Sequence, residues 1–399
     1  MELQNKLSTL QAEAYEELTK NILPYWMNLI DTENAGFYGL VDAQNKLHKH
    51  ADKGGILHAR ILWIFSAAYR LLKDENYFHT ATVAKNYLIE KFTDIEFGGI
   101  YWKLDYLGNP VDTKKQIYNL AFSVYGLSEY YRATGDKSTL DHAIELFYLI
   151  EKYSFDRVNN GYFEAFTRQW HEIDDMRLSD KDANEKKTMN THLHVLEAYT
   201  NLFRVWKSPQ LRKQLINLVE VFIDKIIDKS TYHLKLFFDE TWSPKSETIS
   251  YGHDIEAAWL IFEAAKETQD KILLERTLQL ICPIVDAAME GFQPDKGFDY
   301  EHEPKTNHTD KERHWWVQAE AIVGALEAFR ISNNEKYLDV AASTWQYIKY
   351  QLIDQKHGEW YWSRLENGET HPTQDKAGFW KCPYHNGRMC MEVLKFKIL

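Results

Sequence analysis

The chain has 399 residues, of which 44% are hydrophobic and 27% charged, as in an ordinary globular protein, and its net charge is −12. This acidic balance argues against a nucleic-acid-binding surface, and no run of about 18 apolar residues suggests a membrane span. The first residues lack the basic and apolar regions of a signal peptide, so we expect a cytoplasmic protein. The three cysteines, Cys282, Cys382 and Cys390, are irregularly spaced, which predicts neither a disulfide nor a metal site.

A short glycine-aromatic tag returns along the chain, roughly every 60 to 75 residues, which leaves room for two helices and their loops in each unit. Aromatic residues that alternate behind a glycine predict a short strand or turn. The tags are GFY at 36–38, GGIYW at 98–102, GYF at 161–163, GFDY at 297–300 and GEWYW at 358–362. LFFD at 236–239 takes the missing fourth place without a glycine.

The segments between the tags have helical periodicity. Leu140, Ala143, Ile144, Phe147 and Ile150, for example, form one apolar stripe, as expected of a helix packed on one side. In chain order, we predict helices over residues 7–30, 51–72, 77–92, 118–133, 140–150, 190–206, 211–227, 255–265, 273–289, 317–329 and 337–352, and from 386 onward.

Two kinds of helix alternate in this series. Helices ahead of a tag are apolar on one side, whereas those after it are richer in alanine, leucine and aromatic residues, as if buried all round. Six such pairs can close into a ring whose inner helices present their polar starts at one end. We therefore predict an all-α fold, an (α/α)6 barrel of six helix pairs with short β-hairpins or strands in the connecting loops. Residues 1–399 are expected to form a single catalytic domain, and an open solenoid is the alternative.

One connection, residues 174–187, is long and highly charged. Its first interpretation is a solvated loop. A lid over the pocket is the alternative, because long loops on a rigid scaffold are often functional.

The third inner helix begins with two histidines that point in different directions. At about 100° per residue, Asn190, His194 and Glu197 share one face, while His192 points roughly opposite. His194 is therefore the better pocket candidate, and His192 is interpreted as structural. Two histidines two residues apart on a helix cannot bind one ion, and there is no His-Glu-x-x-His motif, so we predict no metal site.

The fourth unit places His253 three residues before Glu256, on one helix face, where a carboxylate can fix the tautomer of an imidazole. Helix capping around Gly252 and Asp254 is the alternative interpretation. Other units place ionisable or aromatic groups at similar helix starts, where a ring of helices would bring them together. These stretches are His58-Ala59-Arg60, Tyr118-Asn119, HWWVQAE at 314–320 and GFWKCPYHNGR at 378–388. His302, His308 and His314 itself have no such placement and are expected in loops.

A glycosidase with paired carboxylates is an alternative hypothesis, since the same fold can carry such sites. Asp239, Glu240, Asp254, Glu256 and Glu320 could supply the pair, but no two of them stand out. No Gly-x-Gly-x-x-Gly or P-loop motif indicates a bound nucleotide.

Five segments make the chain resemble the N-acylglucosamine 2-epimerase superfamily, and within it the cellobiose 2-epimerases. They are MNTHLHVLEAY at 189–199, LFFD at 236–239, SYGHDIE at 250–256, HWWVQAE at 314–320 and WKCPYH at 380–385. The resemblance implies an (α/α)6 barrel and a cofactor-independent isomerase. Its expected reaction interconverts glucose and mannose at the reducing end of β-1,4-linked disaccharides such as cellobiose and lactose.

The resemblance also implies roles for individual residues. His253 and His385 match the general acid/base pair, and His194 matches a histidine that assists them. Residues that match sugar-binding or histidine-orienting positions are Arg60, Tyr118, Asn190, Glu256, Trp316, Glu320 and Trp380.

Elementary chemistry supports two histidines for such a reaction. The C2–H bond becomes acidic only once the sugar ring opens and the C1 carbonyl can take up charge as an enediolate. Inverting C2 then needs a base on one face and an acid on the other, and imidazole can serve as either near neutral pH. An aldose–ketose isomerase, which returns the proton to a different carbon, and a non-catalytic sugar-binding protein are the further alternatives. The expected partner is a disaccharide, with no nucleic acid or membrane, and the expected state is a monomer or weak dimer.

Overall fold

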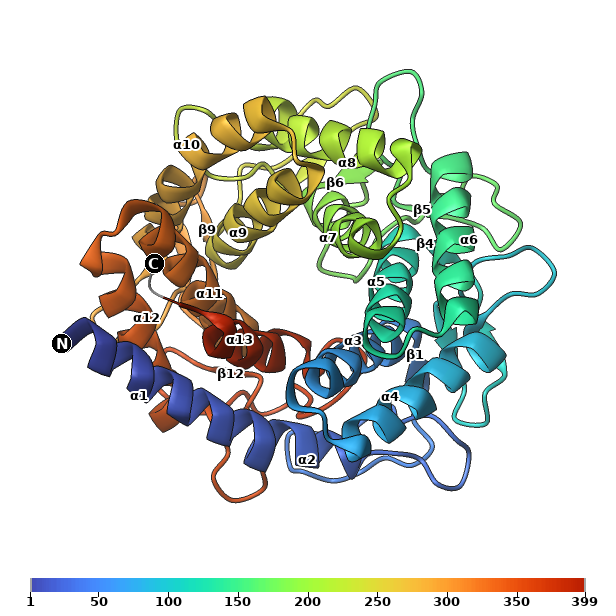
Figure 1. Cartoon of the computed structure of the whole chain (residues 1–399), viewed down its shortest axis with the longest axis horizontal. Helices are drawn as coiled ribbons and strands as arrows, with labels where there is room; N and C mark the ends of the chain where they lie inside the picture. Colours follow the sequence, from blue (N-terminus) through green and yellow to red (C-terminus); the bar gives the residue numbers. More distant parts are fainter. Residues whose placement is uncertain (1, 398–399) are drawn as a thin grey trace.

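The computed structural model describes residues 2–397, and its helices form two concentric rings (Figure 1). Each inner helix packs against the next, and the last packs against the first. The ring is therefore closed, which confirms the barrel and excludes the open solenoid. The inner helices are α3 (Gly55–Leu72), α5 (Ile117–Thr134), α7 (Met189–Val205), α9 (Tyr251–Thr268), α11 (Trp315–Ser332) and α13 (Tyr384–Lys395).

The outer helices cover this ring, and four of them run directly into a π-helical turn that the sequence analysis did not predict. Inner helices such as α3 are buried on every side over most of their length, whereas outer helices such as α6 bury one stripe, as predicted. The outer elements are α1 (Glu2–Glu16) with η1 (Glu17–Ile22) and α2 (Leu23–Met27); α4 (Glu75–Tyr87) with η2 (Leu88–Phe92); α6 (Lys137–Tyr153); α8 (Pro209–Val221) with η3 (Phe222–Ile226); α10 (Lys271–Ala288) with the 3-10 turn η4 (Met289–Gly291); and α12 (Glu335–Tyr347) with η5 (Ile348–Leu352).

Short strands join neighbouring units at the end of the barrel where the inner helices begin. In five units, the strand just before an inner helix pairs with a strand of the next unit, as β4 does with β5. A bridge between Val41 and Ala377 joins the first and last units. The strands are β1 (Lys53–Gly54), β2 (Lys103–Leu104), β3 (Pro110–Asp112), β4 (Lys115–Gln116), β5 (Ala165–Phe166), β6 (Lys187–Thr188), β7 (Phe237–Phe238), β8 (Ile249–Ser250), β9 (Glu301–Glu303), β10 (His308–Asp310), β11 (Arg313–His314) and β12 (Ser363–Arg364).

Each glycine-aromatic tag closes a small turn against the start of an inner helix. At Gly161 the backbone has φ +85°, and a Cβ there would lie 2.8 Å from His192 Nε2, so glycine suits both the conformation and the close approach. The next residue, Tyr162, donates its N–H to that nitrogen at 2.8 Å. The fourth tag is displaced from its predicted place, because the equivalent bridge joins Ile227 to Leu234 and LFFD instead supplies β7.

One polar side chain near the start of each inner helix hydrogen-bonds a tag. Phe37 N–H donates to His58, Leu234 N–H to Asp254 and Phe298 N–H to Gln318. We call these six side chains the tag-binding residues: His58, Asn119, His192, Asp254, Gln318 and Asn386. They fix each inner helix against its connecting loop and so set which residues face the barrel axis.

Buried ion pairs hold the same end of the barrel together. Lys53 binds Asp31 at 2.7 Å, and Lys115 binds Asp94 at 2.8 Å, with all four side chains fully buried. Lys187–Asp156 and Lys376–Asp354 repeat the arrangement.

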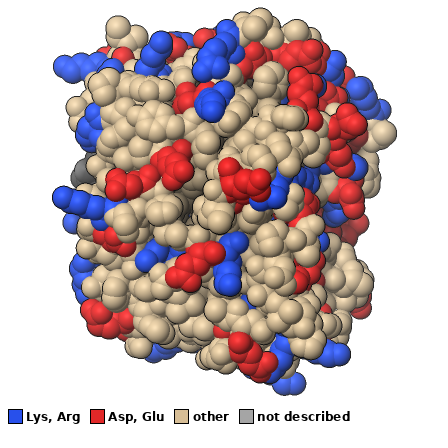
Figure 2. Space-filling view, turned by 90° about the vertical axis from the view of Figure 1, so that its right-hand side faces the viewer, with Lys and Arg blue, Asp and Glu red and all other residues tan. Residues whose placement is uncertain are grey.

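Charged groups on the surface are arranged differently: on the side drawn in Figure 2, acidic and basic residues are interspersed among wide uncharged areas. Within residues 2–397, no helix has both the length and the apolar character needed to cross a membrane.

Candidate active site

A cavity of about 500 Å³ lies at the end of the barrel where the inner helices begin. Nine of the ten site residues predicted from the sequence line it, although they come from all six inner helices or the segments just before them. These nine are Arg60, Tyr118, Asn190, His194, His253, Glu256, Trp316, Trp380 and His385. The tenth, Glu320, lies behind His385. We call Glu320 and the residues bonded with it through Arg388, namely Glu197 and Glu256 with Arg388 itself, the floor of the cavity.

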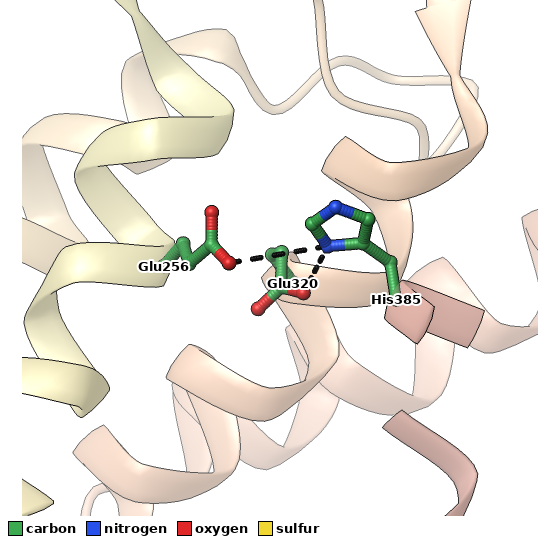
Figure 3. A group of neighbouring side chains, drawn as sticks. All are labelled: Glu256, Glu320 and His385. Carbon is green, nitrogen blue, oxygen red and sulfur yellow. Dashed lines mark hydrogen bonds and ion pairs between the residues drawn. The ribbon is translucent and has the colours of Figure 1, made fainter. Parts of the chain in front are cut away.

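His385, at the start of α13, is held by the floor of the cavity. Its Nδ1 lies 2.7 Å from Glu320 Oε1 and 3.9 Å from Glu256 Oε1, and its other ring nitrogen points away from both carboxyl groups (Figure 3). Burial would raise the pKa of Glu320, but Arg388 and His385 outweigh burial and lower it to about 2. An ionised carboxylate can only accept a hydrogen bond, so Nδ1 carries the proton and Nε2 is left as the free base. Burial lowers the pKa of His385 itself to about 3, despite Glu320.

His194 repeats this arrangement on α7. Its Nδ1 lies 2.9 Å from Glu197 Oε2, one helical turn along, as the predicted shared face requires. Burial opposes ionisation of Glu197, but Arg388 and His194 lower its pKa, so this carboxylate also accepts from Nδ1–H. Burial lowers the pKa of His194 as well. His194 is therefore a neutral imidazole whose Nε2 is free on the wall of the cavity.

His253, on α9, has a hydroxyl partner instead of a carboxylate. Its Nδ1 lies 2.8 Å from Ser250 Oγ, which can donate or accept. Burial lowers the pKa of His253 to about 3, and the nearby His194 and His385 act in the same direction. The ring of Trp316 lies 4.8 Å from His253 and 5.6 Å from His385, centroid to centroid. Two neutral imidazoles from different helices thus share one cavity and one indole neighbour.

One guanidinium, Arg388, holds the carboxyl groups of the floor together. Its Nη2 donates to Glu256 Oε1 at 2.7 Å and to Glu320 Oε1 at 2.6 Å, and its Nη1 binds Glu197. Burial, and then repulsion by Glu320, raise the pKa of Glu256 to about 8, so this carboxyl group holds its proton at neutral pH. With Glu256 neutral, the two remaining carboxylates, Glu197 and Glu320, share Arg388 as their bonded cation.

Arg60, on α3, forms part of the cavity wall. It donates to Tyr118 Oη at 2.7 Å, and its guanidinium lies 4.2 Å from the ring centre of Phe122 and 4.9 Å from that of Tyr384. Its Nε is buried and has no partner in the part of the chain that the structure describes. No carboxylate bonds to this cation among residues 2–397, so its charge is available to an anionic group in the cavity.

Glu256, Glu320 and His385 are the only group in the described part of the chain whose atoms are spaced to hold a metal ion (Figure 3). The same two carboxyl oxygens already accept from Arg388 Nη2. A positive side chain thus occupies the place where a cation would be bound, and this arrangement argues for internal charge balance over metal binding.

The charged loop 174–187 lies over this cavity. Met176, Arg177, Leu178, Ser179, Lys181, Asp182, Ala183 and Glu185 all line it. Gln116 fixes the loop by donating to the carbonyls of Met176 and Arg177 at 3.0 and 2.9 Å. The loop is thus solvated, as first interpreted, since residues such as Asp180 and Lys181 are exposed, and it also lies in the position that the lid alternative requires.

The structure corrects the expectation for His314. It lines the cavity and stacks on Tyr300 at 3.9 Å with ring planes 8° apart, so it is not a loop residue outside the site. His302 and His308 belong to the paired strands β9 and β10. His58, offered as a pocket candidate, instead binds backbone groups of Gly54 and Phe37.

The sequence analysis missed Arg388, Tyr384 and Ser250. A usable signal existed for Arg388: the residue two positions after a tag-binding residue faces the barrel axis and is charged or ionisable in five of six units. These residues are Arg60, His194, Glu256, Glu320 and Arg388. This two-residue spacing can be recognised only when the tag-binding residues are known, and those residues are identified by their hydrogen bonds in the structure.

Comparisons with known proteins identify the family of the chain. The family model described as N-acylglucosamine 2-epimerase (GlcNAc 2-epimerase) matches residues 36–387. A cellobiose 2-epimerase of Bacteroides fragilis is 55% identical over 96% of this chain and 98% of its own, and one from Ruminococcus albus is 42% identical over the same shares. The solved cellobiose 2-epimerase of Bacillus thermoamylovorans B4167 is 43% identical, covers 97% of this chain and 99% of its own, and superposes with a TM-score of 0.92. The expected enzyme class, a carbohydrate epimerase among the isomerases, is confirmed, and the chain belongs to the N-acylglucosamine 2-epimerase family.

Proposed function

We propose that this enzyme interconverts D-glucose and D-mannose at the reducing end of β-1,4-linked disaccharides, turning cellobiose into glucosyl-mannose and lactose into epilactose. The observation that carries the proposal is the pair His253 and His385. Their rings come from different inner helices, line one cavity and both contact Trp316. Inversion at C2 requires this kind of arrangement, with proton carriers supplied from two directions.

In the proposed mechanism, the sugar ring opens and one imidazole removes the C2 proton. His385 is ready as a base, since Glu320 holds its Nδ1–H and leaves Nε2 free. The electrons of the C–H bond pass into the C1 carbonyl and form a cis-enediolate, which Arg60 stabilises from the cavity wall. The other imidazole, once it has taken up a proton from solvent, delivers that proton to the opposite face of C2, and the first imidazolium then returns its proton to solvent.

This proton transfer requires one imidazole to become charged. Burial lowers the pKa of both histidines to about 3, so both are neutral at pH 7. The negative enediolate raises the proton affinity of both rings, so an imidazolium is stabilised as the intermediate forms. Glu256, whose pKa is raised to about 8, holds a further proton beside His385.

Aromatic side chains give the cavity the character of a sugar site. Trp316 and Trp380 line it, and we expect them to stack on sugar rings and exclude water from the intermediate. Asn190 Oδ1 is buried, has no partner within residues 2–397, and can accept from a sugar hydroxyl. The disaccharide is the only partner that the proposal needs, in a cytoplasmic monomer or weak dimer without a cofactor.

The arrangement of carboxyl groups favours this mechanism over glycoside hydrolysis. A hydrolase needs two carboxyl groups on opposite sides of the scissile bond, about 5 to 9.5 Å apart. Of the candidates named above, Glu256 and Glu320 bond to the same guanidinium as Glu197 in the floor, so they act as one unit, and Asp239, Glu240 and Asp254 do not line the cavity.

The test is to incubate the enzyme with cellobiose, lactose or mannose in D2O and to analyse the sugars by chromatography and NMR. We expect 2-epimers of the disaccharides that carry deuterium at C2. Ketose as the main product would indicate the aldose–ketose isomerase instead, and free monosaccharide from cellobiose would indicate a hydrolase. His253→Ala and His385→Ala should each abolish turnover while the fold is kept, and near-normal rates in either variant would refute the assigned roles.

A further inference from the structure

Helix α9 presents a series of side chains down the barrel axis. His253 and Glu256 line the cavity, and Trp259 follows one turn further on. Trp259 is 6% exposed and does not line the active cavity. Together with Arg204 and Glu263, it lines a separate pocket of about 110 Å³. This pocket lies toward the far ends of the inner helices. Trp259 therefore forms the layer between the floor of the active site and the opposite mouth of the barrel.

Trp259 is bonded to the floor from below. Its Nε1–H donates to Glu320 Oε2 at 3.0 Å, and its ring lies 4.7 Å from the guanidinium of Arg388. The other oxygen of Glu320 accepts from His385 Nδ1. The result is a continuous chain of hydrogen bonds from the indole, through one carboxylate, to the imidazole.

We propose that Trp259 is a positioning residue that fixes Glu320, and through it the imidazole of His385, for proton transfer; the inference rests on the proposed function. Since Oε2 has no other donor among residues 2–397, loss of the indole N–H leaves a buried carboxylate oxygen unpaired. Without the indole donor, the negative charge of Glu320 is shared among fewer hydrogen bonds, and the bond that its Oε1 accepts from His385 Nδ1 becomes stronger. The other charged groups that meet at this point are Arg388 and Glu256, with Glu197 reached through Arg388.

The chain contains a matched control at the equivalent place in another unit. Trp63 and Trp259 each lie five residues after a tag-binding residue, His58 and Asp254. Trp63 is as buried as Trp259, at 5% exposure, but its Nε1 has no partner among the described residues and its ring stacks on Tyr125 at 4.9 Å. Trp63→Phe thus removes an indole from the same layer without removing a hydrogen bond.

Two substitutions separate the hydrogen bond of Trp259 from its bulk. Trp259→Phe keeps an aromatic ring without a donor. Trp259→His keeps an N–H at the same position of the five-membered ring but removes the benzene portion. We expect Trp259→Phe to lower kcat for cellobiose about tenfold, as for loss of one hydrogen bond to a charged group, with KM changed about twofold or less. The acid limb of its pH profile should move to higher pH. Trp259→His should stay closer to the wild type in both respects, and Trp63→Phe should match the wild type.

A second readout does not depend on activity. In protein labelled with 15N-histidine, the Nδ1–H proton of His385, assigned by its loss in His385→Asn, should move downfield in Trp259→Phe and stay in place in Trp63→Phe. A resonance and pH profile that are unchanged in Trp259→Phe would overturn the proposal. Lower kcat in Trp259→His than in Trp259→Phe would also overturn it, since that order indicates space-filling. A wild-type enzyme that forms no epimer would refute the proposed function, while the resonance would still decide the role of Trp259.

Discussion

Replacing Arg388 with methionine removes the one cation that binds three buried carboxyl groups. The guanidinium is 1% exposed and bonds to Glu197, Glu256 and Glu320. Removing one partner of a buried ion pair typically costs about 3 to 5 kcal/mol, because the remaining charge is left uncompensated. The whole free energy of unfolding of a domain is about 5 to 15 kcal/mol, so Arg388→Met should be strongly destabilised at pH 7 and still folded at lower pH.

The pH dependence gives this prediction a distinctive sign. In the wild type, the pKa of Glu256 is raised to about 8, whereas the pKa of Glu320 is lowered to about 2 and that of Glu197 is also lowered. Above the unfolded pKa of 4.5, a carboxyl group that keeps its proton when folded makes stability fall by about 1.4 kcal/mol per pH unit. Of these three carboxyl groups, only Glu256 does so in the wild type, and Glu164, whose pKa is also raised to about 8, contributes equally with and without Arg388. Without Arg388, all three should keep protons, and the slope between pH 6 and 7.5 should become steeper by about 2.8 kcal/mol per pH unit.

The assay is urea unfolding followed by tryptophan fluorescence at several pH values. Arg276→Met is the matched control, because Arg276 also faces two carboxylates, Glu220 and Asp224, but is 41% exposed. Its loss should cost about 0 to 1 kcal/mol, without a change in slope. If Arg388→Met has the wild-type slope, or costs no more than the control, the floor is not a charge-balanced unit and the reasoning fails.

Three more predictions concern Glu320, the buried pair of Lys53 and Asp31, and His253. Glu320→Gln should lower kcat by about 10- to 100-fold with KM for cellobiose nearly unchanged, because the charge that orients the imidazole is lost; a rise in KM alone would contradict this. Lys53→Met leaves Asp31 buried and unpaired and should cost about 3 to 5 kcal/mol in urea unfolding, whereas Lys49→Met, whose ion pair is exposed, should be neutral; equal costs would count against it. Burial keeps His253 neutral when folded and lowers its pKa to about 3, so its protonation in the unfolded state destabilises the fold as pH falls below 6.5. His253→Asn should therefore reduce the acid sensitivity of unfolding between pH 6 and 4 by about 1.4 kcal/mol per pH unit, and an unchanged slope would refute the prediction.

The barrel and much of its site could be predicted because both follow from local patterns. Helical phase separates His194, on the face of Glu197, from His192, which binds Tyr162 N–H and Thr188 O on the outer side. The glycine-aromatic tags mark the repeat, since a turn with positive φ against a helix start leaves little room for a side chain at positions such as Gly161. These signals lie within a few residues of one another.

Contacts between distant segments could not be predicted in this way. Arg388 is 132 residues from Glu256 and 191 from Glu197 along the chain, and no local period relates their side chains. Only a closed ring brings these charges to one place, and sequence periodicity does not report closure. The buried pair of Lys53 and Asp31, 22 residues apart, could not be predicted for another reason, because lysine and aspartate in loops ordinarily indicate solvent exposure.

The repeat explains why a histidine at a helix start can be either structural or functional. At the tag-binding position four side chains accept a backbone N–H, those of His58, His192, Asp254 and Gln318, whereas the amides of Asn119 and Asn386 donate. A histidine there has both ring nitrogens occupied, as His192 has, and can take no part in proton transfer. In two units the residue just before this position is a histidine that lines the cavity, His253 or His385. The same register applied to other chains of this fold should therefore separate structural histidines from candidate proton carriers, wherever the tag and its acceptor can be identified.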